Sequence, residues 1–290
     1  MSMRFISFGA MVLLASLATA SRVVAQISLP VKSYETLSVE IQSLRDNISL
    51  FRGDPQNLLI MEVRPNRFKP QVDYFHDAHA TLKIRDLYAI DHPDFTSQMP
   101  AERDKAGGDP PLEETWEIRL SPVGPTDFAL VCERGESAFD FSDFEVRRVS
   151  MRAVETKVEV EFSSQNPIAL ERFAARVIAG SLQFQHILHA QAKEISLDLP
   201  DAECHLEITG KEFEGESEIN VLGVPAKMQL LVSRKVGLRV TGPAATIAGF
   251  EAPHMSRTGE EWVSQGYAEA KCRIHLTFGS EVPKLGVEWE

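Results

Sequence analysis

The stretch that decides the fold is TKVEVEF at residues 156–162, where apolar and polar residues alternate at every step. Similar stretches follow: SLQFQ at 181–185, CHLEI at 204–208 and KMQL at 227–230. Alternation with a period of two is typical of a β-strand with one buried face. The equivalent positions are taken as Val158, Leu182, Leu206 and Met228, with offsets of 24, 24 and 22 residues. This spacing predicts a β-solenoid, whose coils bury their apolar rows against each other.

The alternation extends through most of the chain with few helical signals, which predicts an all-β protein built as a solenoid-like stack of short strands. Strands are predicted at 36–41, 48–51, 58–63, 71–75, 80–87, 116–120, 128–132, 138–141, 146–151 and 172–178, and near the end at 268–278 and 287–289. We expect a small N-terminal β region at 26–90 packed on the rungs, a flexible polar loop at 91–114, and a rung domain at 115–290. Residues 246–266 are predicted to form a long loop.

The first 25 residues have the composition of a secretory signal peptide. One early positive charge, Arg4, precedes an apolar stretch of about 16 residues and then small residues. Cleavage after Ala25 is favoured, and cleavage after Ala20 also satisfies the small-residue rule. An uncleaved anchor is the alternative, but a membrane-spanning helix needs about 20 apolar residues. The expected location is therefore periplasmic or secreted, with no transmembrane segment in the mature chain.

The charge of the chain excludes one class of partner. The protein has 30 basic and 42 acidic residues, a net charge of −12. Loss of residues 1–25 removes Arg4 and Arg22 and no acid, which leaves 28 basic and 42 acidic residues and a net charge of −14. Such a chain repels nucleic acid and anionic lipid. No nucleic-acid partner is expected.

The three cysteines, Cys132, Cys204 and Cys272, all fall in the apolar phase of predicted strands. They are too few for a disulfide-stapled scaffold, so we interpret them as small core residues. One disulfide between neighbouring rungs remains an alternative, and the sequence does not choose the pair.

Outward positions on successive rungs form the candidate binding set. These residues are Glu159, Glu161, Gln183, Gln185, His205, Glu207, Lys227 and Gln229. A polar face of this kind could bind a strand, a glycan or a protein, and its other interpretation is a solvated sheet face.

Other polar clusters are interpreted as structural. The sequence HDAH at 76–79 could offer two imidazoles and a carboxylate to a metal, but no third ligand follows at a zinc-like spacing, so it is predicted to be a hairpin tip. His186 and His189 are predicted to lie on opposite faces of a strand. The acids at 140, 143 and 145 alternate with core phenylalanines and are predicted to face solvent rather than calcium. No metal and no cofactor are predicted.

Residues 116–122 (WEIRLSP), 134–142 (RGESAFDFS) and 149–153 (VSMRA), with the closing segments 267–270 (YAEA) and 287–289 (VEW), resemble the toast-rack domains. These β-rung domains also form the C-terminal part of cell-wall-active antibiotic response regulators (LiaF-like). The resemblance implies a toast-rack or β-helix type of fold and a role in envelope-stress signalling through protein contacts. Those regulators carry several transmembrane helices before the rungs, whereas this chain carries only the predicted signal peptide.

Two functions of different classes follow. The first is a non-enzymatic bacterial cell-envelope protein that acts by binding or scaffolding, with a protein or an envelope glycan as partner. The second is a β-solenoid carbohydrate-active enzyme, or a glycan-binding or adhesin module. The sequence has no nucleophile elbow, phosphate-binding loop, dinucleotide fingerprint or paired-cysteine motif, so no catalytic residue is predicted.

Overall fold

Two long strands, β8 (Thr126–Asp140) and β9 (Val146–Glu161), each run from one sheet of the protein into a second sheet. The computed structural model describes residues 25–44, 46–64, 70–86, 114–211, 213–243 and 253–290. β8 pairs with β2 (Thr36–Ser43) through its first half and with β3 (Asn47–Arg52) through its second half. Its path bends at Arg134 and Gly135, which both have positive φ. One coil of the solenoid therefore places one strand in each sheet.

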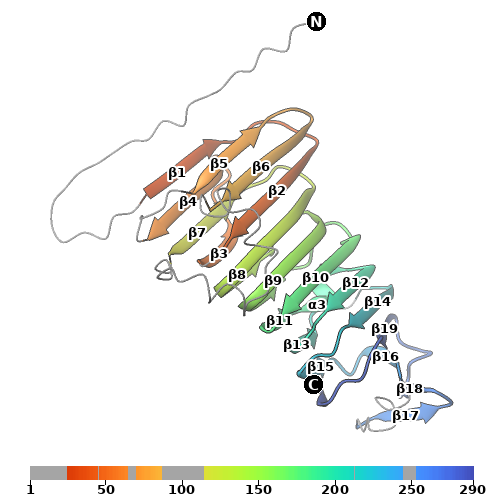
Figure 1. Cartoon of the computed structure of the whole chain (residues 1–290). Helices are drawn as coiled ribbons and strands as arrows, with labels where there is room; N and C mark the ends of the chain where they lie inside the picture. The colour runs from red at the N-terminus through yellow and green to blue at the C-terminus, as the bar shows by residue number, and fades with distance from the viewer. Residues whose placement is uncertain (1–24, 45, 65–69, 87–113, 212, 244–252) are drawn as a thin grey trace, which may run out of the picture.

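The first sheet contains, in spatial order, β1 (Ala25–Pro30), β4 (Asn57–Arg64), β7 (Thr115–Leu120), β3, the second halves of β8 and β9, β11 (Ser181–Gln185), β13 (Glu203–Ile208), β15 (Lys227–Val232) and β20 (Leu285–Trp289). Its strands are parallel from β7 to β20, and the β1–β4 and β4–β7 pairs are antiparallel. Figure 1 shows these strands stacked obliquely from the N-terminal to the C-terminal end of an elongated molecule.

The second sheet contains β5 (Gln71–Phe75), β6 (His79–Arg85), β2, the first halves of β8 and β9, β10 (Arg172–Ile178), β12 (Glu194–Asp198), β14 (Gly215–Leu222), β19 (Cys272–Phe278), β16 (Val236–Thr241), β18 (Glu261–Ser264) and β17 (Met255–Thr258). The fold class predicted from the sequence, an all-β stack of short strands, is confirmed. The N-terminal strands are hydrogen-bonded into the same two sheets as the later rungs.

The order of the strands in space differs from their order in the chain at both ends. β6 and β7 follow β2 and β3 in the sequence but lie beyond them, on the side away from β8. β19 inserts between β14 and β16, although β16 precedes it in the chain. A fixed period in the sequence therefore describes only the middle coils, from β8 to β15.

The apolar rows of both sheets form one core between them. In the alternating stretches that decide the fold, the following apolar residues are at most 1% exposed: Val158, Val160, Phe162, Leu182, Phe184, Leu206, Ile208 and Leu230. The three cysteines are all buried in this core. Burial in this apolar core raises the pKa values of the Cys132 and Cys204 thiols to about 12.

The predicted register of the rungs is wrong at one position. Leu182 lies opposite Cys204 and not Leu206, and Cys204 lies opposite Met228. The spacings of the first-sheet row are thus 24 residues from Val158 to Leu182, then 22 and 24. A slip of two residues leaves the same side chains on the buried face, so the alternation alone could not detect it.

The C-terminal predictions also need correction. Part of the predicted loop at 246–266 is a hairpin of β17 and β18, which turns near Gly259 at a positive φ of 64°. β19 begins at Cys272 rather than at 268, because turns occupy residues 267–269. Residues 1–24, predicted as most of the signal peptide, and residues 91–113 of the predicted loop lie outside the described residues. The last residue of that loop, Glu114, is buried.

Candidate functional site

The structure places the predicted binding set on the outer face of the first sheet. One row across the strands contains Glu159, Gln183, His205 and Gln229, which pair in register. A second row contains Glu161 and Gln185, with Glu207 on β13 next along it. Lys227 belongs to a third row, opposite Glu203. All eight residues therefore share one surface, as the alternation predicted.

Contacts within this face are short and partly neutralise its charges. Lys157 Nζ lies 2.7 Å from Glu159 Oε1 and His205 Nε2 lies 3.3 Å from Glu207 Oε1. Glu159, through its hydrogen bond, raises the pKa of the Lys157 ammonium. The face offers rows of mixed polar groups at the strand spacing, about 4.8 Å.

The interpretation of His186 and His189 as residues on opposite faces is wrong. His186 immediately precedes α3 (Ile187–Ala190), a single helical turn, and His189 lies within it. The two rings stack with their centroids 5.6 Å apart. Residues three apart lie on the same side of a helical turn, whereas a strand would separate them. His189 Nδ1 lies 2.7 Å from the carbonyl oxygen of Phe162, so this ring joins the turn to the neighbouring rung.

The HDAH segment forms the hairpin predicted between β5 and β6. Asp77 accepts a hydrogen bond from the backbone amide of His79 at 2.8 Å, which stabilises the turn. The His76 ring contacts the Ser33 carbonyl oxygen and the His79 ring contacts the Thr36 hydroxyl, each at 2.9 Å. The two rings thus have separate structural partners.

The cluster of acids and phenylalanines at the end of β8 and in the turn after it is also structural. Phe139, Phe141 and Phe144 are buried, while Asp140 accepts a hydrogen bond from the Ser142 amide. The Ser164 hydroxyl donates to Asp143 at 2.8 Å, across to the next rung. Within the ranges that the structure describes, no group of three or more metal-ligating side chains converges.

The outer face of the second sheet carries a feature that the sequence predictions missed. β9 and β10 each present two arginines four residues apart, with a small residue midway between them. In the register of the parallel strands, Arg148 lies opposite Arg172 and Arg152 lies opposite Arg176. We call this array the arginine furrow, and its residues are Arg148, Ser150, Arg152, Arg172, Ala174 and Arg176.

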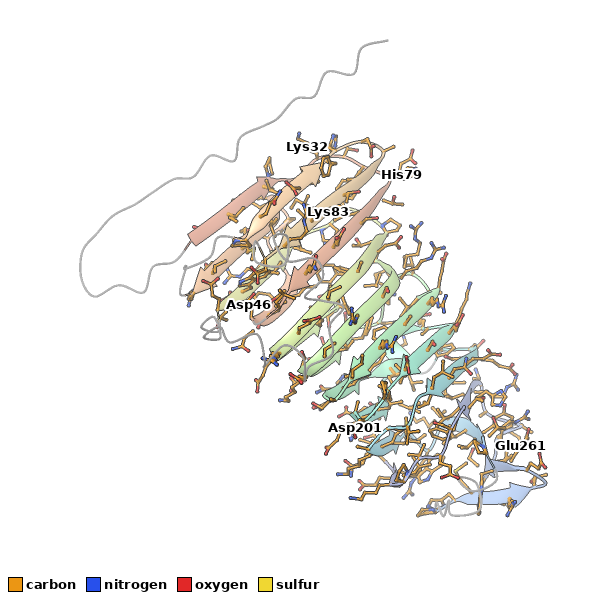
Figure 2. The ribbon with its side chains drawn as sticks, viewed as in Figure 1. Lys32, Asp46, His79, Lys83, Asp201 and Glu261 are labelled. Atoms are coloured by element: carbon orange, nitrogen blue, oxygen red, sulfur yellow. The ribbon has the colours of Figure 1, made fainter. Side chains whose placement is uncertain are left out.

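Four residues of the furrow, Arg148, Ser150, Arg172 and Ala174, line an open groove of about 710 Å³. Arg152 and Arg176 lie next to it on the same face, two register positions beyond Ser150 and Ala174 along β9 and β10. The floor of the groove is a row of small residues on adjacent strands, Ala129 on β8, Ser150 and Ala174, and Ser196 on β12 continues this row beyond the groove. At the end towards the N-terminus the same row continues as Glu40 and Lys83, whose charged groups are 2.7 Å apart. Figure 2 labels Lys83 on β6. The small floor is therefore bounded at this end by a salt bridge.

Three of the four furrow arginines have acidic neighbours. Arg148 lies 2.6 Å from Glu171. Arg172 lies 3.6 Å from Glu194, and Arg176 lies 3.2 Å from Asp198, so both arginines are directed towards β12. These three arginine side chains are 57 to 59% exposed, and exposed ion pairs of this kind contribute less than about 1 kcal/mol each.

Arg152 differs from the other three arginines. Across the described ranges its side chain has no hydrogen-bond or ion-pair partner. The sequence does contain a signal for the whole array: RVSMR at 148–152 and RFAAR at 172–176 repeat the same spacing 24 residues apart. The period of the rungs is read from the apolar positions alone. Outward charged residues are usually interpreted as solubilising, so this arginine repeat is not recognised as a feature.

A second, smaller hollow of about 480 Å³ lies further along the same face. Arg239 on β16 and Arg273 on β19 line it with His275, and Tyr267 forms one wall. The guanidinium of Arg239 lies 4.7 Å from the centre of the Tyr267 ring, and Arg273 pairs with Glu216 at 2.8 Å. Both arginines are thus engaged by neighbouring side chains.

Comparisons with known proteins do not identify a family. No model of a known protein family matches the chain, and no characterised protein does. A solved structure of a proposed cell adhesion protein from Clostridium sporogenes aligns over 92% of this chain and 99% of its own, with 13% identity and a TM-score of 0.43. That of a proposed adhesin from Bacteroides fragilis aligns over 92% and 98%, with 9% identity and a TM-score of 0.36. Similarity at this level carries no functional argument.

The described residues contain no helix that is long and apolar enough to cross a membrane.

Proposed function

We propose that the protein is a non-enzymatic binding or scaffold protein of the bacterial cell envelope, located in the periplasm or secreted. The observation that carries this proposal is the in-register ordering of outward side chains over the length of two continuous sheets. Hydrogen-bonded strands hold such rows at fixed spacing, so a partner meets a surface that is already ordered and loses less entropy on binding.

The composition of the N-terminus supports a location outside the cytoplasm, because residues 1–25 have the pattern of a signal peptide. The first described strand is compatible with a cut after Ala25. β1 begins at Ala25, and its residue Gln26 pairs with Glu62. Removal of residues 1–25 would thus leave almost all of the first strand in its sheet.

The resemblance to toast-rack domains supports a partner in envelope-stress signalling, and the open groove supports an envelope glycan. The second candidate function, a carbohydrate-active enzyme, would need carboxylates on the groove wall at a separation suited to acid and nucleophile. Two acidic residues line the groove, Glu40 and Asp127. Glu40 pairs with Lys83, and Asp127 accepts two hydrogen bonds from Arg147, so ion pairs hold both. The pairing favours binding over hydrolysis.

Two measurements test the proposal: the retention of envelope components by the protein and the depolymerisation of envelope polysaccharides. Purified mature protein is immobilised and exposed to envelope polysaccharides and to a detergent extract of envelope proteins, and the release of new reducing ends is followed in parallel. We expect saturable retention of a component without new reducing ends. Release of reducing ends, abolished by the exchange of Glu40 or Asp127 for the amide, would overturn the proposal in favour of the enzyme.

A further inference from the structure

We propose that the arginine furrow binds an acidic oligosaccharide, a short sugar chain that carries carboxylates. This inference deepens the proposed function and rests on it, because it assigns a ligand class to one face of the binding protein. Its basis is the 2 × 2 array of arginines around a floor of small residues.

The first argument is the electrostatic cost of the array. Two arginines lie directly opposite two others on neighbouring parallel strands, about 4.8 Å apart. Like charges in directly opposite positions destabilise a sheet. Such a pair of opposite arginines occurs twice, once on either side of Ser150 and Ala174, in a chain with a net charge of −12. The acids Glu171, Glu194 and Asp198 offset part of this repulsion, and an anionic ligand would offset the remainder.

The second argument is the shape of the furrow. Arginines four residues apart on one strand have their backbones about 13 Å apart, and the small residue midway leaves space between the two side chains. The small row runs across four strands, from Ala129 to Ser196. A linear ligand can therefore lie across the strands, with arginines on both sides.

The third argument concerns the charges at the two ends of the furrow. Glu40 and Lys83 bound the small row beyond β8, and the acids Glu194 and Asp198 flank it on β12. The cationic section is thus confined to β9 and β10. It fits a few sugar units and would repel the continuation of a long, densely charged polymer.

The fourth argument selects the chemistry of the anion. The planar guanidinium of arginine binds carboxylates through two parallel hydrogen bonds. The floor offers the hydroxyls of Ser150 and Ser196, which can bond to sugar hydroxyls. Single-stranded nucleic acids are bound mainly by base stacking on aromatic rings. Among the described residues that line the groove, the one aromatic side chain, Phe128, is 2% exposed. A glycan fits the furrow better.

A ligand carboxylate can replace the acidic side chains that pair with the furrow arginines, because these ion pairs are exposed. The acids that pair with Arg148, Arg172 and Arg176 are themselves 37 to 44% exposed and can return to water when a ligand carboxylate replaces them. Arg152 needs no such exchange, since its side chain has no ion-pair partner within the described part of the chain. We expect Arg152 to contribute most to binding.

The test is calorimetric titration of mature protein with hexagalacturonate, a linear chain of six galacturonic acids. Maltohexaose, which is uncharged, and a single-stranded DNA hexamer serve as comparison ligands. The double variant Arg152→Ala/Arg176→Ala removes one side of the furrow, and Ala174→Phe fills its floor without a change of charge. Arg64→Ala/Lys284→Ala is the matched control, with the same loss of charge at exposed positions near the two ends of the first sheet, outside the groove.

We expect hexagalacturonate to bind, and the affinity to fall about tenfold or more in both furrow variants. The control should change the affinity by less than about twofold, since both of its charges are remote from the ligand. The proposal is overturned if hexagalacturonate does not bind, if the control loses as much affinity as the furrow variants, or if maltohexaose or the DNA hexamer binds equally well. If the wild type still retains an envelope component in the test above, only this inference fails; if it retains none, the proposed function fails as well.

Discussion

The rings of Phe173 and Phe184 meet between the two sheets with their centroids 4.7 Å apart. Phe173 belongs to β10 in the second sheet and Phe184 to β11 in the first. Both side chains are fully buried. Phe184 also lies 6.1 Å from Phe162 of the preceding rung, so this residue connects the sheets and the rungs at once.

Replacement of Phe184 by alanine should therefore lower the free energy of unfolding by about 3–5 kcal/mol, through lost burial and the cavity left behind. The neighbouring Gln183 points outward, and Gln183→Ala should cost less than about 0.5 kcal/mol. Urea unfolding of both variants measures the difference. Equal losses would mean that the strand phase described for β11 is incorrect.

Gly135 is required where β8 passes from the second sheet to the first. Its φ is +109°, and a Cβ at this position would lie 2.9 Å from the backbone carbonyl oxygen of Asp46. We expect Gly135→Ala to destabilise the protein by about 1–3 kcal/mol, because both the backbone conformation and the contact oppose a side chain. Gly286→Ala is the matched control, since nothing lies within 4 Å of its added Cβ. Thermal unfolding in which the two variants melted alike would contradict this role.

Asp46 makes the stability depend on pH. Burial raises the pKa of this carboxyl from 3.8 to about 7, with further contributions from Asp86 and Glu114, although the Ser43 hydroxyl donates to it at 2.6 Å. Because the folded-state pKa lies above the unfolded one, the folded state favours the protonated form. The associated stability is complete below about pH 4 and is lost as the pH rises through 7.

The variant Asp46→Asn should remove this pH-dependent contribution to the free energy of unfolding. Relative to wild type, it should gain stability at pH 8 but not at pH 4, and the gain should be at most about 4 kcal/mol. Asp201→Asn, at an exposed position, is the control and should change the stability by less than about 0.5 kcal/mol. Figure 2 labels both aspartates. Denaturant unfolding at several pH values tests this, and a pH profile of Asp46→Asn that matched wild type would exclude the buried carboxyl as its source.

The sequence was sufficient to predict the strands because each strand exposes one face and buries the other. The alternation of apolar and polar residues therefore indicates both the strand and its orientation. The sequence was insufficient where alternation carries no information. The partner of Leu182 could be Cys204 or Leu206, since both lie on the same face. The helical turn at His186 and His189 consists of four residues, too few for a helical period to be visible.

The candidate site illustrates a different limit. All eight outward residues predicted from the sequence share one face, because their orientation follows from the period of two. The arginine furrow escaped prediction because its meaning depends on which strands are neighbours. Arg152 and Arg176 become adjacent only once β9 and β10 are paired in parallel register, and a sequence shows spacing but not pairing.

The boundary of the mature chain can be tested directly. The signal-peptide pattern ends at Ala25 or Ala20, and the first described strand begins at Ala25. Cleavage after Ala25 would keep the backbone pairs from Gln26 to Leu29, which hold β1 to the edge of the first sheet. We therefore expect N-terminal sequencing of the exported protein to begin at Gln26, or at Ser21 if the upstream site is used.

A single substitution separates the two cleavage sites. Signal peptidases require a small residue immediately before the cut, so Ala25→Arg should block the favoured site and move the first residue of the mature protein to Ser21. The matched variant Ala20→Arg should leave Gln26 as the first residue, because it changes only the upstream site. Sequencing of both variants from the exported fraction distinguishes these outcomes. Recovery of the intact Met1 terminus from membranes of the wild type would show instead that the segment is an anchor.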